Sequence, residues 1–243
     1  MDGIAVWPVM VLALVHLFGS RLWKMDQVPR SIWLSIGGGV AVSYVFMHLF
    51  PEMHAGQQHI ERKYEDLSDY LQHHIYMVAL IGLTVFYGLE RAVITGKREK
   101  DKEQFLEDRA HSIFWLHIAS FSLYNALIGH IMFSREEGSE QSVIMFTIAM
   151  ALHFLVNDLS LLQLHRQAYR KYGRWCLVLS LLIGWALGFL IELPRTTEIL
   201  ITAFIGGGII LNVLKEELPE ERESRYWAFV LGVVFYALLW MAL

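Results

Sequence analysis

The sequence is poor in charge and has almost no cysteine. Only 18% of its 243 residues are charged, 20 of them Lys or Arg and 24 of them Asp or Glu, whereas soluble globular domains contain about 25%. The one cysteine, Cys176, can form neither an internal disulfide nor a cysteine-based metal cluster. The sequence has no basic stripe of the kind that binds nucleic acid, no cofactor motif, and no nucleophile paired with a base in an apolar segment. We therefore expect no enzymatic activity, no organic cofactor and no nucleic-acid partner.

Apolar residues make up 55% of the chain and gather in long runs. A membrane-spanning helix needs about 20 mostly apolar residues, and the shorter runs reach that length only with their flanking residues. A buried core helix could explain one short run but not a whole series. The sequence therefore predicts an all-α integral membrane protein, an eight-transmembrane-helix bundle that forms a single transmembrane domain over residues 1–243. The eight segments almost free of charge are 4–18, 32–50, 75–89, 113–133, 143–164, 175–191, 199–214 and 227–243.

Basic residues indicate the orientation, because connections rich in Lys and Arg stay in the cytoplasm. When the connections are assigned alternately to the two sides, 16 of the 20 Lys and Arg fall on one side. That side includes the mixed-charge connection 92–111 between the third and fourth segments, which we interpret as a solvated cytoplasmic loop. Both termini are then outside, in a multi-pass protein of the plasma membrane. The chain begins without the pattern of a signal peptide, so we expect the first span to be retained.

The connection between the second and third segments is predicted to lie outside and is rich in histidine and acidic residues. These are ligand types that suit zinc and similar divalent ions, but their spacing matches no fixed zinc motif. A metal-collecting loop and an ordinary polar surface both remain open. The histidines concerned are His54, His59, His73 and His74.

The second and seventh segments share a pattern. Residues 36–39 and 205–208 both read Ile-Gly-Gly-Gly, and Pro-Glu follows in each copy, at 51–52 and 219–220. Glycine lets a neighbouring helix approach closely, and the proline is expected to end each helix at the membrane interface. Because the two segments cross the membrane in opposite directions, the pattern indicates an inverted repeat, which is typical of secondary transporters. Coincidence between two glycine-containing helices is the alternative.

These features together resemble the ZIP (zinc and iron permease) family of divalent-metal transporters. The resemblance rests on His-Leu-Phe-Pro-Glu at 48–52, on Leu-Pro-Glu at 218–220, on eight spans with both ends outside and on a long cytoplasmic loop after the third span. In topology it covers essentially the whole chain, and in sequence it is confined to spans two, four, five and seven. It implies a ZIP-like bundle that carries zinc, iron or manganese.

The family's metal site lies at mid-membrane, where His-Asn-x-x-Glu-Gly on span four faces His-x-x-x-Glu-Gly on span five. Here His153 matches the histidine of span five, and Asn157 and Asp158 stand at the Glu and Gly positions. On span four Asn125 stands at the carboxylate position, and the histidine and asparagine positions hold Phe and Ser. Two carboxylates and one histidine of the family pattern are missing. The metal ligands that the resemblance implies are His153, Asn157, Asp158, Asn125 and Ser122.

The residues alone draw attention to the same two helices. A spacing of four places His153 and Asn157 on one helix face, while Asp158 lies about 140° from His153 at 100° per residue. Asp158 is the only charged residue within the eight segments, and since a lone carboxylate in hydrocarbon costs about 2.5–3.5 kcal/mol, it needs a cation, a proton or a partner. Either His153 and Asn157 line a path while Asp158 pairs elsewhere, or Asp158 titrates alone. Four further histidines could extend a polar pathway or be ordinary interior residues, namely His16, His48, His117 and His130.

Two hypotheses of function follow. The first is a ZIP-like membrane transporter of divalent metal cations, zinc above all, in which imidazole and amide groups take the place of the family's carboxylates. The second is a ZIP-like membrane protein that does not transport and serves as a sensor, a partner subunit or a binder of another ligand such as haem. The expected partners are the lipid bilayer and the metal ion as substrate, and a homodimer is compatible with both hypotheses.

Overall fold

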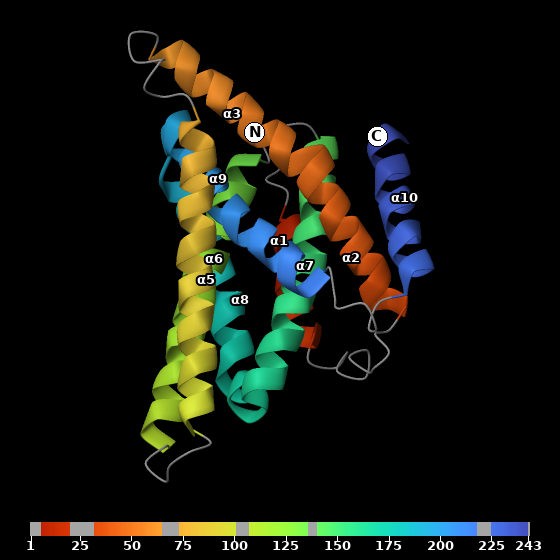
Figure 1. Ribbon diagram of the computed structural model, residues 1–243. Coiled ribbons are helices and arrows are strands. Elements are labelled where there is room, and N and C mark those ends of the chain that lie inside the picture. Colours follow the sequence, from red (N-terminus) through yellow and green to blue (C-terminus); the bar gives the residue numbers. More distant parts are fainter. Residues whose placement is uncertain are drawn as a thin grey trace.

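The computed structural model describes residues 6–19, 32–64, 73–100, 107–135, 140–217 and 225–242 (Figure 1). Within these ranges all regular structure is helical, which confirms the all-α prediction. Three short π-helical segments occur there, η2 (Val45–Leu49), η4 (Tyr169–Gly173) and η5 (Val213–Glu217). The α-helices are α1 (Trp7–Gly19), α2 (Ile32–Tyr44), α3 (Phe50–Lys63), α5 (His74–Lys100), α6 (Glu107–Arg135), α7 (Glu140–Ala168), α8 (Arg174–Leu190), α9 (Arg195–Asn212) and α10 (Tyr226–Ala242).

The helices follow the apolar segments because a backbone in hydrocarbon must satisfy its own hydrogen bonds. The described helices α1 and α10 are also apolar but have only 13 and 17 residues, fewer than the five longer stretches named at the end of this paragraph. These features are compatible with a multi-pass membrane protein. Five described stretches are long and apolar enough to cross a membrane, namely His74–Ala92, Ser112–Phe133, Glu140–Leu162, His165–Leu190 and Arg195–Lys215.

The helix of the second segment does not end at Pro51. α2, η2 and α3 form one continuous rod from Ile32 to Lys63, which crosses the molecule diagonally in Figure 1. The expectation that Pro51 ends the helix is therefore wrong. The π-helical turn directly before Pro51 widens the helix and accommodates the proline, which would otherwise clash with the carbonyl four residues earlier.

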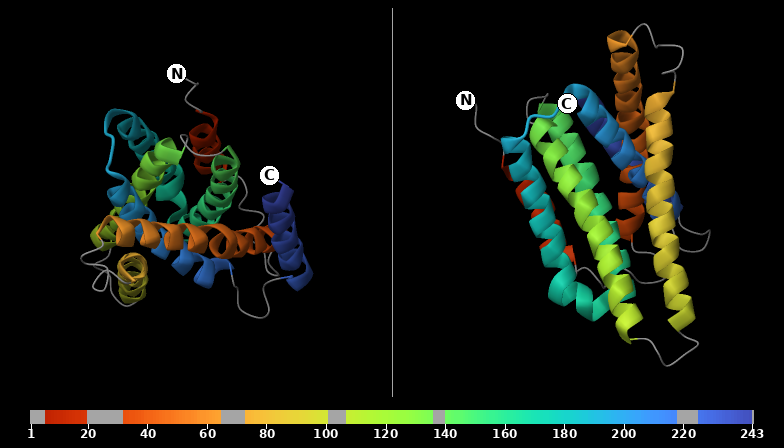
Figure 2. Two further views of the ribbon diagram at one scale, coloured as in Figure 1. Left: turned by 90° about the horizontal axis from the view of Figure 1, so that it is seen from above. Right: turned by 90° about the vertical axis from the view of Figure 1, so that its left-hand side faces the viewer.

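Three pairs of helices pack most extensively, namely α6 with α8, α5 with α9, and α2 with α10. Figure 2 shows α6 and α8 side by side, and α10 beside one end of α2. In each pair both helices present a glycine to the partner's backbone, so that an added methyl group would overlap a carbonyl oxygen of the partner. Such close approach is typical of membrane helices with small residues at the contact. The glycines are Gly129 and Gly184, Gly82 and Gly207, and Gly39 and Gly232.

The predicted connection 92–111 is helical at both of its ends, while the stretches apolar enough to cross a membrane stop at Ala92 and resume at Ser112. α5 extends to Lys100, and α6 already begins at Glu107. Lys, Arg and Glu have good helix propensity, so the charged stretch continues the apolar helices beyond their membrane-spanning parts. Residues 101–106 lie outside the described residues.

Candidate functional site

His153 lies in the middle of α7 and is hydrogen-bonded to neutral side chains from three helices. Its Nε2 accepts a hydrogen bond from the amide of Asn157 at 3.0 Å, and the hydroxyl of Tyr124 on α6 lies 3.1 Å from the same nitrogen. Its Nδ1 lies 3.3 Å from the amide nitrogen of Asn212 on α9. His153 and Asn157 are 4% and 5% exposed, so this cluster lies within the bundle. The spacing of four on α7 brings His153 and Asn157 together, as the sequence indicated.

Asp158 has a different partner. Its carboxylate oxygens lie 2.9 and 3.1 Å from Nδ1 of His16, on α1. The other nitrogen of His16 lies 2.8 Å from the side-chain oxygen of Asn125, whose amide donates to the backbone oxygen of Phe121 at 2.8 Å. Because the amide of Asn125 is oriented by that bond, its oxygen must accept from His16. The α1 helix ends against this pair, since a methyl group at Gly19 would lie 3.0 Å from a carboxylate oxygen of Asp158.

The protonation of this pair follows from its geometry. Nε2 of His16 donates to Asn125, so Nδ1 either donates to an ionised Asp158 or accepts from a protonated one. In both cases the pair carries no net charge. The carboxylate that the sequence left without a partner is thus compensated by α1, inside the bundle.

The predicted ligand residues therefore form two clusters rather than one. His153 and Asn157 belong to the first, while Asn125 and Asp158 belong to the second, with His16. This matches the arrangement in which Asp158 pairs elsewhere. Ser122 is half-buried on α6, and within the described part of the chain it makes no hydrogen bond with either cluster.

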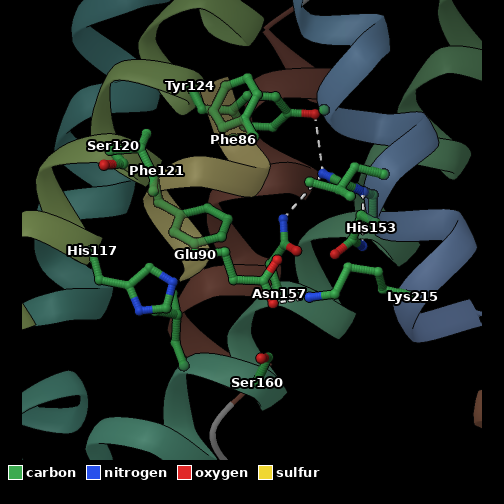
Figure 3. A pocket seen from close by; sticks show the side chains of 15 residues that line it. Phe86, Glu90, His117, Ser120, Phe121, Tyr124, His153, Asn157, Ser160 and Lys215 are labelled. Atoms are coloured by element: carbon green, nitrogen blue, oxygen red, sulfur yellow. Dashed lines mark hydrogen bonds and ion pairs between the residues drawn. The ribbon is translucent and has the colours of Figure 1, made fainter. Parts of the chain in front are cut away.

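A cavity of about 320 Å³ leads to His153, and we call it the His153 cavity. It extends from the middle of α6, α7 and α9 to Glu90, near the end of the apolar part of α5, and to Lys215 in η5. Glu90 and Lys215 form an ion pair, and Figure 3 shows it together with the contacts of His153. The lining residues are Phe86, Leu89, Glu90, His117, Ser120, Phe121, Tyr124, His153, Asn157, Ser160, Leu161, Gly208, Leu211, Asn212 and Lys215.

The donors at the end of the cavity are neutral. They are an imidazole, two amides and a phenol, and the nearest carboxylate in the cavity wall, Glu90, is paired with Lys215. Among the described residues, no three His, Cys, Asp or Glu side chains come close enough to hold a metal ion together. That finding covers the described outer histidines as well, of which His54 and His59 are exposed on α3. A metal at His153 would thus be held by mixed nitrogen and oxygen donors without a fixed negative charge.

Several residues of the two clusters were not among the predicted ligands. His16 was one of four histidines without an assigned role, and Tyr124 was not among the candidate residues. Asn212 was missed, although it lies four residues after Gly208 and therefore on the same face of α9. A search for polar residues at that spacing from the triple-glycine segments would have found it. Glu90 and Lys215 gave no such signal, because charged residues are ordinary at the ends of spans.

Comparisons of the chain with protein-family models, with curated proteins and with solved structures found no match.

Proposed function

We propose that the chain is a ZIP-like membrane transporter of divalent metal cations, with eight transmembrane helices, inverted repeats and zinc as the best-fitting substrate. The observation that carries the proposal is the His153 cavity, which leads from one end of the bundle to a cluster of neutral metal donors at mid-helix. Imidazole suits zinc better than manganese, which prefers carboxylates and water. Weak binding is compatible with transport, because an ion must also leave the site.

A second cavity supports a path through the bundle. It has a volume of about 190 Å³, lies between α3 and α9, and is lined by Glu52, His59 and Ala203 among others. On α9, Gly206 lies between Ala203 of this cavity and Gly208 of the His153 cavity, and there Leu49 packs closely, within 3.1 Å of a Cβ built at Gly206. Two cavities separated by a packed layer are what an alternating-access transporter has when one side is closed.

The inverted repeat is supported by matching features of α2 and α9. Gly39 on α2 touches the backbone of α10, and the π-helical segment that starts at Val45 follows six residues later. Gly207 on α9 touches the backbone of α5, and the π-helical segment that starts at Val213 also follows six residues later. π-Helical turns are frequent at functional sites. The π-helical segment η2 lies three residues before Glu52, which lines the second cavity. The π-helical segment η5 contains Lys215, which lines the His153 cavity.

The second candidate function is a protein with the same fold that binds a ligand but does not transport. The observation that favours it is the neutral donor set, since among the described residues no three charged or histidine ligands converge. A carboxylate at the cavity end would distinguish the two. Asn157→Glu places one beside His153 and is expected to raise zinc affinity in both cases, but it changes transport only if an ion passes there.

Uptake of metal into proteoliposomes tests the proposal. Full-length protein is reconstituted with a trapped dye that responds to the metal under test, and zinc, iron and manganese are added outside in separate experiments. We expect zinc-dependent uptake by the unmodified protein and at least a tenfold loss in His153→Ala, because the imidazole is the strongest donor of the cluster. His130→Ala is the matched control, since His130 is also a buried histidine, on α6, but lies outside the cavity lining. Equal rates in empty liposomes, unmodified protein and His153→Ala, for all three metals, would rule out transport.

A further inference from the structure

His117 is a buried histidine that neither cluster uses. It lies on α6, is 6% exposed and lines the His153 cavity. Its Nδ1 has no hydrogen-bond partner among the described residues. Its ring lies 5.1 Å from the ring of Phe121 and 5.7 Å edge-on from that of His165, measured between centroids. A buried polar nitrogen without a partner costs free energy. A ligand that supplies the missing hydrogen bond would remove this cost and would therefore bind favourably here.

The surroundings of His117 restrict the chemistry of that ligand. Phe86, Leu89, Phe121 and Leu161 form apolar and aromatic walls of the cavity, and Figure 3 shows His117 beside Phe121. The charges of Glu90 and Lys215 offset one another in their ion pair. The part of the cavity near His117 therefore has no unpaired charge among the described lining residues. It offers flat apolar contacts, with the imidazole of His117 and the hydroxyl groups of Ser120 and Ser160 as polar groups.

The volume of the cavity restricts the size of the ligand. Pockets for small organic ligands measure about 300–1,000 Å³, and the His153 cavity, at about 320 Å³, is at the lower end of that range. An acyl chain would fill the apolar part but leave the nitrogen of His117 unpaired. A metal ion near His117 would find one imidazole, whereas the cluster around His153 supplies an imidazole, two amides and a phenol.

From these observations we propose that the cavity binds a small neutral aromatic molecule with one hydrogen-bonding group, held by Nδ1 of His117 and packed against Phe121. This site goes beyond the proposed metal transport and does not depend on it. The ring of the ligand lies among the apolar side chains, and its polar group pairs with His117. Because the same space leads to His153, a bound molecule also blocks the way to the donor cluster.

Binding of 2-naphthol tests this site, with naphthalene as the matched probe that lacks the hydroxyl group. The full-length protein in lipid nanodiscs is placed in equilibrium dialysis against empty nanodiscs, which corrects for partition into lipid. We expect one saturable site that binds 2-naphthol about tenfold more tightly than naphthalene, because one neutral hydrogen bond changes an affinity by up to about that factor. In His117→Phe, which keeps an aromatic ring of similar size, the two probes should bind equally well.

Two further variants locate the site. His130→Phe is the control, because His130 is also on α6, also buried, and also has a ring nitrogen without a partner in the described part of the chain, but does not line the cavity. It should leave both affinities unchanged. Ser160→Phe places a bulky side chain in the cavity wall and should abolish binding.

Three results would overturn the proposal: no saturable binding to the unmodified protein, a preference for 2-naphthol that persists in His117→Phe, or full binding in Ser160→Phe, which would place the probe in lipid or elsewhere on the protein. Size-exclusion elution at the volume of the unmodified protein and a cooperative thermal unfolding transition show that each variant is folded. Zinc uptake is not read in this experiment, so the failure of one proposal is distinguishable from the failure of the other.

Discussion

Asp158 illustrates how a single charged residue is accommodated within the apolar core of this molecule. Its partner, His16, is 142 positions away in sequence and on a different helix. Both residues are 1% exposed, and the ring of His16 stacks on Phe154 at 4.5 Å between centroids. A buried pair of this kind is weak evidence for net stability, but removal of one partner alone leaves an uncompensated polar or charged group. The pair therefore fixes where α1 lies against α7.

The coupling between His16 and Asp158 can be measured. Asp158→Ala should destabilise the protein by about 3 kcal/mol, because it leaves Nδ1 of His16 buried without a hydrogen-bond partner. Asp158→Asn should cost less, since an amide can either accept a hydrogen bond from Nδ1 of His16 or donate one to it. The double variant His16→Ala, Asp158→Ala should cost clearly less than the sum of the single variants. Unfolding of the purified protein in mixed detergent micelles gives these free energies, and strictly additive costs would contradict the pairing.

At the scale of helices, the reciprocal glycine contacts determine which helices lie together. Apolar side chains cannot do so, because lipid tails are as apolar as leucine. Moving a leucine from lipid to a helix contact therefore gains no hydrophobic free energy that would favour one partner over another. On α5, Gly82 packs against the backbone of α9 at Phe204, whereas a side chain at Gly88 would meet nothing within 4 Å. One helix therefore carries a glycine that is required by packing and a glycine that is not.

This difference predicts opposite effects of one methyl group on the same helix. Gly82→Ala should destabilise the bundle by about 1–3 kcal/mol, because the methyl group overlaps the carbonyl oxygen of Phe204 and forces α5 and α9 apart. Gly88→Ala should be neutral or stabilise by up to about 1 kcal/mol, since alanine has the better helix propensity. Thermal unfolding of both variants under identical detergent conditions compares them directly. If both variants lose stability equally, the close contact of α5 and α9 is wrong.

At the scale of the whole molecule, the sequence predicted the helices far better than their contacts. Runs of apolar residues determine where helices form, because every backbone group in hydrocarbon must be paired within its own segment. The angle between His153 and Asp158 on α7 also followed from the sequence, and so did the separation of their roles. The identity of the partners did not, since His16 and Asn212 reach α7 from helices distant along the chain. The continuation of the helix past Pro51 was missed because a π-helical turn has no clear sequence signal.

The orientation of the molecule is the last prediction, and it follows from charge alone. The ends of α3 and of the α7–η4 turn lie at opposite ends of the bundle in Figure 1. Because basic connections stay in the cytoplasm, the basic η4 should face the cytoplasm, and Lys63 at the end of α3 should face outside with both termini. The test uses single cysteines at the exposed positions Arg62 and Lys171, in a Cys176→Ala background. A membrane-impermeant maleimide added to intact cells should label Arg62→Cys and should label Lys171→Cys only after lysis. Labelling of both cysteines from outside would show that α3 and η4 lie on one side, and labelling of Lys171→Cys alone would show that the bundle is inserted the other way up.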